Sequence, residues 1–291
     1  MLVAWHMYFK LHSPPRGAYH PESPRRLELL SRGLKLVEGL YTRVTPGVGD
    51  VWVYGRVHDR LYLEEIVGDL ETTMEGFFID NDTYISPGTL EAVKALAGSV
   101  SLALEEVDGG HVFIAGRPPG HHAGVSGPAL GAPTQGFCIL NTAALLAVML
   151  SERGGVAVLD FDVHHGNGTQ EILMGRPEVI HVDLHQDYRT IYPWTGAPDL
   201  RGKGNLYNIN LPPGSGDDVY SDALDLVEDL LGEWGPRYIV VSAGFDMYNG
   251  DNNFSYMRAS SSTLHRLGAI VSKYRSVTIL EGGYGDGLVR G

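Results

Sequence analysis

The segment from Val156 to Gly168 places two aspartates and a histidine directly after a short apolar run. The run Val156 to Leu159 is typical of a buried strand, and Asp160, Asp162 and His164 follow it at intervals of two residues. In an extended chain alternate side chains share a face, so these three groups would point the same way at the end of the strand. Buried carboxylates need a cation or a proton donor beside them. Oxygen and nitrogen donors of this kind suit Zn²⁺ or Fe²⁺, and the segment therefore predicts a metal site rather than a solvated strand end.

Segments of strand length alternate with segments of helical periodicity along the chain. Helices are predicted over residues 25–38, 89–107, 139–150, 218–234 and 260–274, and strands over 112–115, 156–159, 179–184, 206–211, 238–241 and 277–280. This alternation predicts an α/β fold with a central, mostly parallel sheet and helices on both faces. No low-complexity linker or internal repeat is visible, so we expect one domain over residues 1–291.

Charge and cysteine content exclude several classes of protein. The 22 Lys and Arg against 35 Asp and Glu give a net charge of -13, which argues against direct nucleic-acid binding. Cys138 is the only cysteine, so neither a disulfide framework nor a thiolate zinc site can form. The chain start does not resemble a signal peptide, and no stretch approaches the roughly 18–20 apolar residues of a membrane span. We expect a cytoplasmic protein without a membrane partner; the sequence does not indicate an oligomeric state.

Chemically active side chains follow several of the predicted strands. In a parallel sheet the carboxyl ends of the strands lie at one edge, where ligands bind. The segments that reach this edge are Arg117 to Gly124, Asp160 to His165, Asp183 to His185, Ser242 to Asp246 and Glu281 to Tyr284. Asp246 is the best candidate for a third metal ligand beside Asp162 and His164, because three protein ligands leave a position open for water or substrate.

Two adjacent histidines and a tyrosine could supply the proton transfers. His121 and His122 lie in a Pro-rich loop, and imidazoles titrate near neutral pH. Asp160 next to one of them would favour imidazolium, whereas the neutral Asn167 would leave its partner a better base. Tyr284 follows two glycines and could donate a hydrogen bond to a developing oxyanion. Taken singly, each of these residues could instead be a surface or packing residue.

Aromatic residues in two further segments could wall a narrow channel for an alkyl chain. These segments are Gly136-Phe137-Cys138 and Ile191-Tyr192-Pro193. Ordinary core packing is the alternative explanation for both of them.

Together these motifs resemble the histone-deacetylase superfamily, which includes acetylpolyamine amidohydrolases and acetoin-utilisation proteins. The resemblance covers nearly the whole chain, and Asn167 resembles the class II branch. It is carried by His20 to Arg26, Val57-His58, Tyr84 to Pro87, Arg117 to Ala123, Asp160 to Gln170 and Glu281 to Tyr284. The resemblance implies an arginase-like α/β fold of one domain and hydrolysis of N-acetyl amides with a single Zn²⁺ or Fe²⁺. The implied substrates are acetyl-lysine in proteins or acetylated polyamines.

The resemblance also implies roles for individual residues. Asp162, His164 and Asp246 would hold the metal. His122 would act as general base and then acid with Asn167 as its polar partner, His121 paired with Asp160 would be an electrostatic or proton-donating partner, and Tyr284 would stabilise the tetrahedral intermediate. Gly136, Phe137 and Tyr192 would line the channel, Arg26 would lie near an internal acetate pocket, and Asp80 or Asp82 would grip the substrate. A structural K⁺ would be bound by carbonyls of Asp160, Asp162 and His164, with Asp183 and Leu184.

The chain departs from the family pattern at two positions, and two other functions stay open. Asp183 stands where Ser is usual, which affects the K⁺ site, and Trp194 stands where Gly is common, at the channel mouth. An arginase-like ureohydrolase would need a carboxylate at position 248 as a ligand for a second Mn²⁺, and this position is Tyr248 here. The other alternative is a catalytically inactive protein that binds acetylated ligands.

Overall fold

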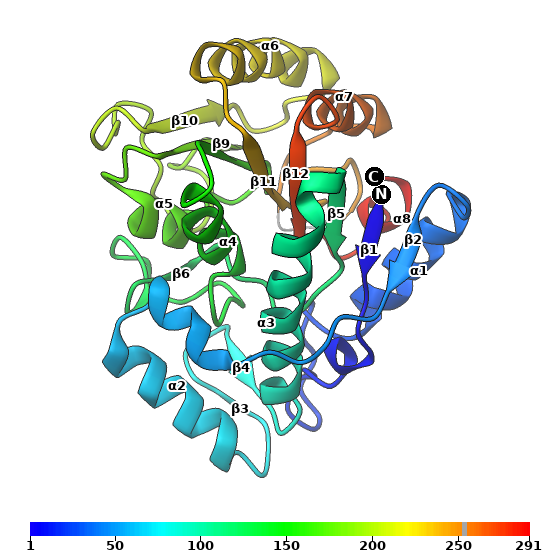
Figure 1. Ribbon diagram of the computed structural model, residues 1–291, viewed down its shortest axis with the longest axis vertical. Helices are drawn as coiled ribbons and strands as arrows, with labels where there is room; N and C mark the ends of the chain where they lie inside the picture. Colours follow the sequence, from blue (N-terminus) through cyan, green and yellow to red (C-terminus); the bar gives the residue numbers. More distant parts are fainter. Residues whose placement is uncertain (252–254) are drawn as a thin grey trace.

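The computed structural model describes residues 1–251 and 255–291. Its centre is an eight-stranded sheet in the order β10-β9-β8-β11-β12-β5-β1-β2. Every neighbouring pair in this sheet is parallel over the described residues (Figure 1). The strands are β1 (Leu2–Ala4), β2 (Thr42–Val44), β5 (His111–Ile114), β8 (Val156–Asp160), β9 (Val179–Gln186), β10 (Leu206–Leu211), β11 (Tyr238–Ala243) and β12 (Arg275–Leu280).

Helices connect most of these strands, and two short hairpins lie outside the sheet. The helices are α1 (Arg25–Leu36), α2 (Arg60–Thr72), α3 (Thr89–Glu106), α4 (Thr142–Ser151), α5 (Asn167–Leu173), α6 (Asp217–Trp234), α7 (Ser261–Val271) and α8 (Gly287–Arg290). The hairpins pair β3 (Phe77–Phe78) with β4 (Tyr84–Ile85) and β6 (Ala123–Gly124) with β7 (Gly127–Pro128). Among the described residues, no helix has both the length and the apolar character needed to cross a membrane.

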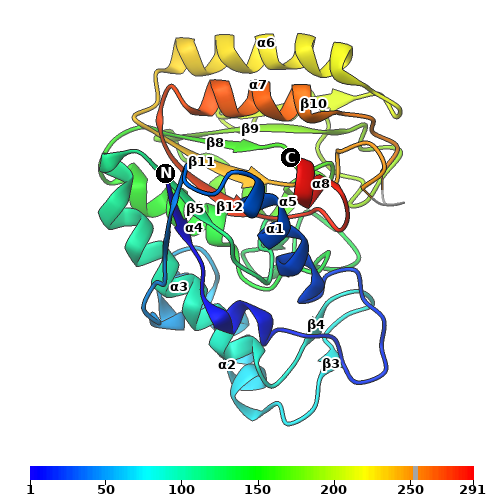
Figure 2. The same cartoon turned by 90° about the vertical axis from the view of Figure 1, so that its right-hand side faces the viewer.

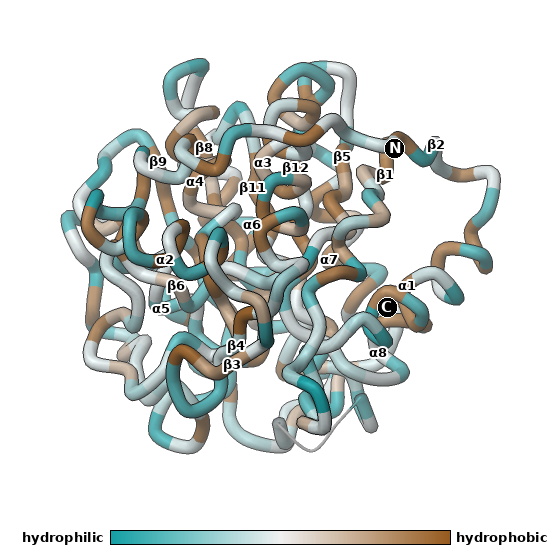
Figure 3. The backbone as a smooth tube through the Cα atoms, turned by 90° about the horizontal axis from the view of Figure 1, so that it is seen from below, coloured by the Kyte–Doolittle hydropathy of each residue, from teal (hydrophilic) through white to brown (hydrophobic). Residues whose placement is uncertain are grey.

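Each central strand faces two hydrophobic cores. Val156 and Val158 of β8 pack in the core formed with α3 and α4, whereas Ala157 and Leu159 pack against α6 and α7. Figure 2 shows α6 and α7 on one side of the sheet and α3 and α4 on the other. In Figure 3 hydrophobic segments run through the strands in the middle of the molecule. Burial on both faces explains why these strands are continuous apolar runs rather than alternating ones.

Side chains and glycine mark the ends of the helices. Asn141 accepts a hydrogen bond from the Ala144 N–H at 2.8 Å and so caps α4. α6 begins with Asp217 and Asp218, whose charges suit the positive end of the helix dipole, and it ends at Gly235 with φ 64°. The Asp217 carboxylate also accepts bonds from Ser260, which ties the start of α6 to the start of α7.

The predicted parallel α/β sheet with helices on both faces is confirmed. The strand predicted over 206–211 has those bounds, and the other predicted strands and helices are present with ends shifted by a few residues. The prediction omitted β1, β2, α2, α5, α8 and both hairpins. β1 and β2 are only three residues long and lie at one edge of the sheet.

The chain leaves the extended conformation after Asp160, so the expectation that Asp160, Asp162 and His164 share one face of a strand is wrong. The Asp162 N–H donates to Asp160 Oδ1 at 3.0 Å, and the His164 N–H donates to Asp162 Oδ1 at 2.9 Å. Such side-chain bonds to the backbone two residues on form turns that compete with strand pairing. These turns, rather than the alternation of side chains along a strand, determine the directions of the Asp162 and His164 side chains.

A buried ionic cluster around Glu22 joins α1 to the loop after β5. Glu22 Oε1 lies 2.5 Å from Arg117 Nε and 3.1 Å from an Arg26 amino group, and His12 Nε2 lies 3.3 Å from Oε2. The carboxylate and both guanidinium groups are at most 1% exposed. Burial alone would raise the pKa of Glu22, but Arg117 and the other partners hold it well below its ordinary value. The cluster thus fixes the segment that leads to His121 and His122.

We expect Glu22→Gln to destabilise the protein by about 3–5 kcal/mol, because it leaves two buried guanidinium groups short of a counter-charge. Denaturant unfolding of the variant measures this loss. Glu28→Gln on the exposed face of α1 is the matched control and should change stability by no more than about 0.5 kcal/mol. Equal stability of the two variants would contradict this account of the cluster.

Candidate active site

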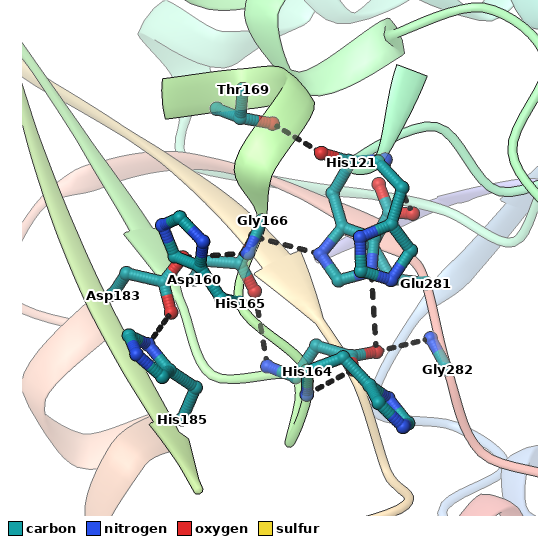
Figure 4. Close-up of polar contacts among 12 residues, drawn as sticks. His121, Asp160, His164, His165, Gly166, Thr169, Asp183, His185, Glu281 and Gly282 are labelled. Carbon is teal, nitrogen blue, oxygen red and sulfur yellow. Dashed lines mark hydrogen bonds and ion pairs between the residues drawn. The ribbon is translucent and has the colours of Figure 1, made fainter. Parts of the chain in front are cut away.

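The segments that follow β5, β8 and β12 line a cavity at the carboxyl edge of the sheet, and Asp246, which follows β11, lies beside it. The cavity has a volume of about 300 Å³. Its described lining consists of Asp82, Pro119, His121, His122, Gly136, Phe137, Cys138, Asp162, His164, Tyr192, Gly282 and Tyr284. Figure 4 shows His121, His164 and Gly282 close together beside the network around Asp183. Because all these strands are parallel, their ends deliver side chains to one place.

Asp162, His164 and Asp246 form a compact group of metal-binding type. One donor atom from each residue lies within 4.8 Å of the others. His164 Nδ1 is 3.1 Å from Asp162 Oδ1 and 3.2 Å from Asp246 Oδ2. Both carboxylates are 1% exposed, and Asp246 Oδ2 has no hydrogen-bond partner among the residues that the structure describes. A buried carboxylate oxygen with no donor is a strong reason to expect a cation there.

The charges at this group are balanced only if a positive charge is present. Burial lowers the pKa of His164, but the carboxylates of Asp162 and Asp246 outweigh it and raise the pKa to about 9. Burial and the neighbouring Asp162 raise the pKa of Asp246 to about 6. Two carboxylates and one imidazole are also a donor set that suits Zn²⁺ or Fe²⁺. The residues present therefore fit a divalent ion.

His122 is held as a neutral imidazole with a defined tautomer. Its Nδ1 lies 2.7 Å from Asn167 Oδ1, and Asn167 Nδ2 donates to the Ala129 carbonyl at 2.9 Å. Since the Asn167 oxygen can only accept, Nδ1 carries the proton and Nε2 is left as the basic atom. Burial, together with His121 and His164, holds the pKa of His122 well below its ordinary value. His122 can therefore accept a proton near neutral pH.

His121 lies beside carboxylates, and its pKa is shifted in the opposite direction to that of His122. Its Nδ1 is 3.0 Å from Asp160 Oδ2, and its Nε2 is 3.9 Å from Asp162 Oδ2. Burial acts to lower its pKa, but Asp160 and Asp162 outweigh burial and raise it well above the ordinary value. The Glu281 carboxylate accepts the backbone N–H of His121 at 3.2 Å and so holds the loop. The two neighbouring rings, 4.0 Å apart, thus differ in charge.

Tyr284 faces the cavity from a loop that Asp251 holds in place. Burial raises the pKa of Tyr284 well above its ordinary value despite the nearby Arg26, so its hydroxyl stays protonated. The Asp251 carboxylate accepts the N–H groups of Tyr284 at 2.8 Å, Gly285 at 2.9 Å and Gly287 at 2.8 Å. Sequence reasoning missed Asp251, because an aspartate in a turn between Asp246 and α7 carries no signal of a partner 33 residues away.

The remaining predicted residues occupy several places. Gly136, Phe137, Tyr192 and Asp82 line the cavity. Arg26 is not among the lining residues: it is 1% exposed and lies behind Tyr284, with its guanidinium carbon 4.9 Å from the ring centroid.

Asp183 lies within β9 opposite Asp160 rather than after the strand. Its Oδ1 lies 2.7 Å from His185 Nδ1, and its Oδ2 accepts the Gly166 N–H at 2.9 Å (Figure 4). Leu184 also lies within β9, and its side chain is buried in the core beside α6 and α7. A K⁺ site at Asp160, Asp162, His164, Asp183 and Leu184 stays a prediction.

Comparison with known proteins identifies the family. Residues 20–290 match the model of the histone deacetylase domain. The chain is 35% identical to a histone deacetylase-like amidohydrolase of Pseudomonas aeruginosa, over 95% of this chain and 75% of that protein. It is 36% identical to acetylpolyamine amidohydrolase 1 of the same organism, over 75% of this chain and 65% of the relative.

Solved structures agree with this assignment. The HD domain of HDA15 superimposes with a TM-score of 0.85 at 28% identity, covering 99% of this chain and 88% of that one. An acetylpolyamine aminohydrolase from Burkholderia pseudomallei gives a TM-score of 0.82 at 28% identity, covering 98% and 94%. The fold, the matched domain and the relatives lead to one conclusion: this chain belongs to the histone deacetylase family of deacetylases and amidohydrolases.

Proposed function

We propose that this protein is a metal-dependent deacetylase that hydrolyses N-acetyl amides on alkylamine chains. The substrate would be acetyl-lysine in a protein or an acetylated polyamine. The observation that carries the proposal is that Asp162 and His164 line one cavity with His122, while Asp246 completes a group of three metal-binding side chains beside them. Family membership and the relatives named for amidohydrolase activity support the same reaction.

Asp162, His164 and Asp246 would hold Zn²⁺ or Fe²⁺, which when bound supplies Lewis-acid polarisation of an acetyl oxygen and of a water. His122 Nε2 would take a proton from the attacking water, because Nδ1 is committed to Asn167. The Tyr284 hydroxyl would donate to the oxyanion of the tetrahedral intermediate. A histidine would then protonate the leaving amine, and His121 beside Asp160 carries a proton to support this step.

The narrow part of the cavity suits an alkyl chain. Phe137 and Tyr192 line it, and the Tyr192 ring lies 5.0 Å from the His122 ring in an edge-on arrangement. The Tyr192 hydroxyl donates to the Thr134 carbonyl at 2.8 Å, which holds the ring in place. An apolar stem could therefore pass between aromatic side chains while its terminal amide reaches His122.

Replacing His122 by Ala should lower kcat by about 10²- to 10⁴-fold, the usual contribution of a general acid–base group. Tyr284→Phe should lower kcat by about 10²- to 10³-fold through loss of an oxyanion donor. Zn²⁺-loaded protein is assayed on an acetyl-lysine peptide and on acetylated polyamines. His265→Ala, at an exposed position on α7, and Tyr41→Phe are the controls. Unchanged turnover in both His122→Ala and Tyr284→Phe would end this mechanism.

Cation binding should release about one proton and weaken as the pH falls below 9, because the ion must displace the proton that His164 holds with a pKa of about 9. Calorimetric titration with Zn²⁺ at pH 7.5, in two buffers of different ionisation enthalpy, measures this proton release. His164→Gln should abolish tight binding, and His265→Gln should retain it. Tight Zn²⁺ binding by His164→Gln would show that His164 is not a ligand.

Asp251→Asn should lower kcat about tenfold or more with KM within about twofold, since it weakens the bonds that place Tyr284. The effect should be absent in the Tyr284→Phe background, because the hydroxyl that Asp251 helps to position is missing there. Asp286→Asn, at an exposed position in the same loop, is the matched control. An equal loss of kcat in both backgrounds would mean that Asp251 acts only on stability.

A further inference from the structure

Trp194 adopts a backbone conformation that a tryptophan rarely occupies. Its φ is 61°, in the left-handed region that favours glycine. Its side chain is 57% exposed, so core packing does not offset this strain. Phe137, which lines the cavity, has φ 73° and shares this feature. Strained residues that persist beside a cavity point to a role in binding.

The exposed indole of Trp194 contacts a residue that lines the cavity, although Trp194 itself is not among the described lining residues. Its ring packs edge-on against Tyr192, with ring centroids 5.9 Å apart and an interplanar angle of 73°. The Tyr192 ring in turn lies 5.0 Å from His122 and 6.3 Å from His164. A substrate whose amide lies beside His122 and whose chain follows Tyr192 would therefore bring its far end to the exposed indole.

An acidic side chain also lines this cavity. Asp82 lines the cavity, and the Thr134 hydroxyl donates to its Oδ2 at 2.6 Å. The carbonyl of Thr134 accepts the Tyr192 hydroxyl, so Asp82 and the Tyr192–Trp194 wall are joined through one residue. Among the described residues, those that line the cavity include no Lys or Arg. An acidic side chain and an exposed aromatic face are suited to a positively charged ligand.

We infer that Trp194 is a specificity-determining residue that selects N-acetylated diamines and longer polyamines over neutral amides, by cation–π contact of its indole with the free ammonium group. The inference rests on the proposed function and deepens it by naming the part of the substrate that is recognised. Asp82, in the lining of the same cavity, supplies a carboxylate for the same ammonium group. The departure from Gly at position 194 is then the feature that adapts this channel to a cationic chain.

The test compares two substrates that differ only in charge. N-acetylputrescine ends in an ammonium group, and N-pentylacetamide carries a methyl group in its place. The measured quantity is the ratio of kcat/KM for the two substrates with Zn²⁺-loaded protein. Trp194→Leu should lower this ratio by about 2- to 30-fold, mainly through KM for the cation, the range expected for one cation–π contact. Trp194→Phe should retain most of the ratio.

Two controls separate recognition from stability. Trp52→Leu replaces another exposed tryptophan, outside the cavity lining, and should leave the ratio unchanged. Trp194→Gly should lower the ratio while leaving the thermal unfolding temperature equal or higher, because glycine adopts this backbone conformation without strain. A purely structural role for Trp194 would lower the unfolding temperature instead.

The possible outcomes are distinct. An unchanged ratio in Trp194→Leu overturns the inference while leaving the deacetylase intact. An equal loss on N-acetylputrescine and on an acetyl-lysine peptide with neutral flanking residues would mean that Trp194 contacts the shared alkyl chain rather than the ammonium group, which also overturns the inference. If the wild-type protein hydrolyses none of these amides, the proposed function fails and the inference fails with it.

Discussion

The attraction between two buried carboxylates and a positive charge organises this molecule. Asp162 and Asp246 follow neighbouring strands, β8 and β11, and both lie within reach of His164. When they are shielded from water, two such carboxylates repel each other unless a cation or a proton lies between them. The parallel sheet brings them together, and the two hydrophobic cores on its faces supply the free energy that holds them there.

Several features of the chain serve this arrangement. Gly244 and Gly282 approach the Asp162 carboxylate so closely that a Cβ at either position would overlap it. The Gly282 N–H donates to Asp162 Oδ2 at 2.7 Å, which leaves the other oxygen directed toward His164. Around this centre the two adjacent histidines differ: Asp160 and Asp162 raise the pKa of His121, whereas burial, His121 and His164 lower the pKa of His122. A pair of identical side chains can thus take different parts in one reaction.

Much of the fold could be predicted from sequence because its signals are local. Apolar runs of strand length alternate with amphipathic segments, and polar residues follow the strands, so the parallel sheet was predicted together with the edge at which the cavity lies. The extension of the strand through His164 was wrong, since Asp160 and Asp162 bind backbone N–H groups of their own turn. The resemblance to the family added roles that spacing alone leaves open, and those roles stay predictions until tested.

The roles of Glu22 and Asp251 could not be predicted from sequence, because their partners are far away along the chain. Glu22 meets Arg117 across 95 residues, and Asp251 meets Tyr284 across 33. No periodicity or motif in the sequence indicates that these pairs meet. Each contact depends on how loops from different parts of the chain pack. Such contacts position the side chains that act, and only the folded structure reveals them.

The most direct test of this account is a crystal of the protein grown with Zn²⁺ and measured at the zinc absorption edge. The account predicts an anomalous peak about 2.0–2.2 Å from donor atoms of Asp162, His164 and Asp246. A zinc ion bound elsewhere, for example at Asp160, His181 and Asp183, with none at the predicted position, would contradict it.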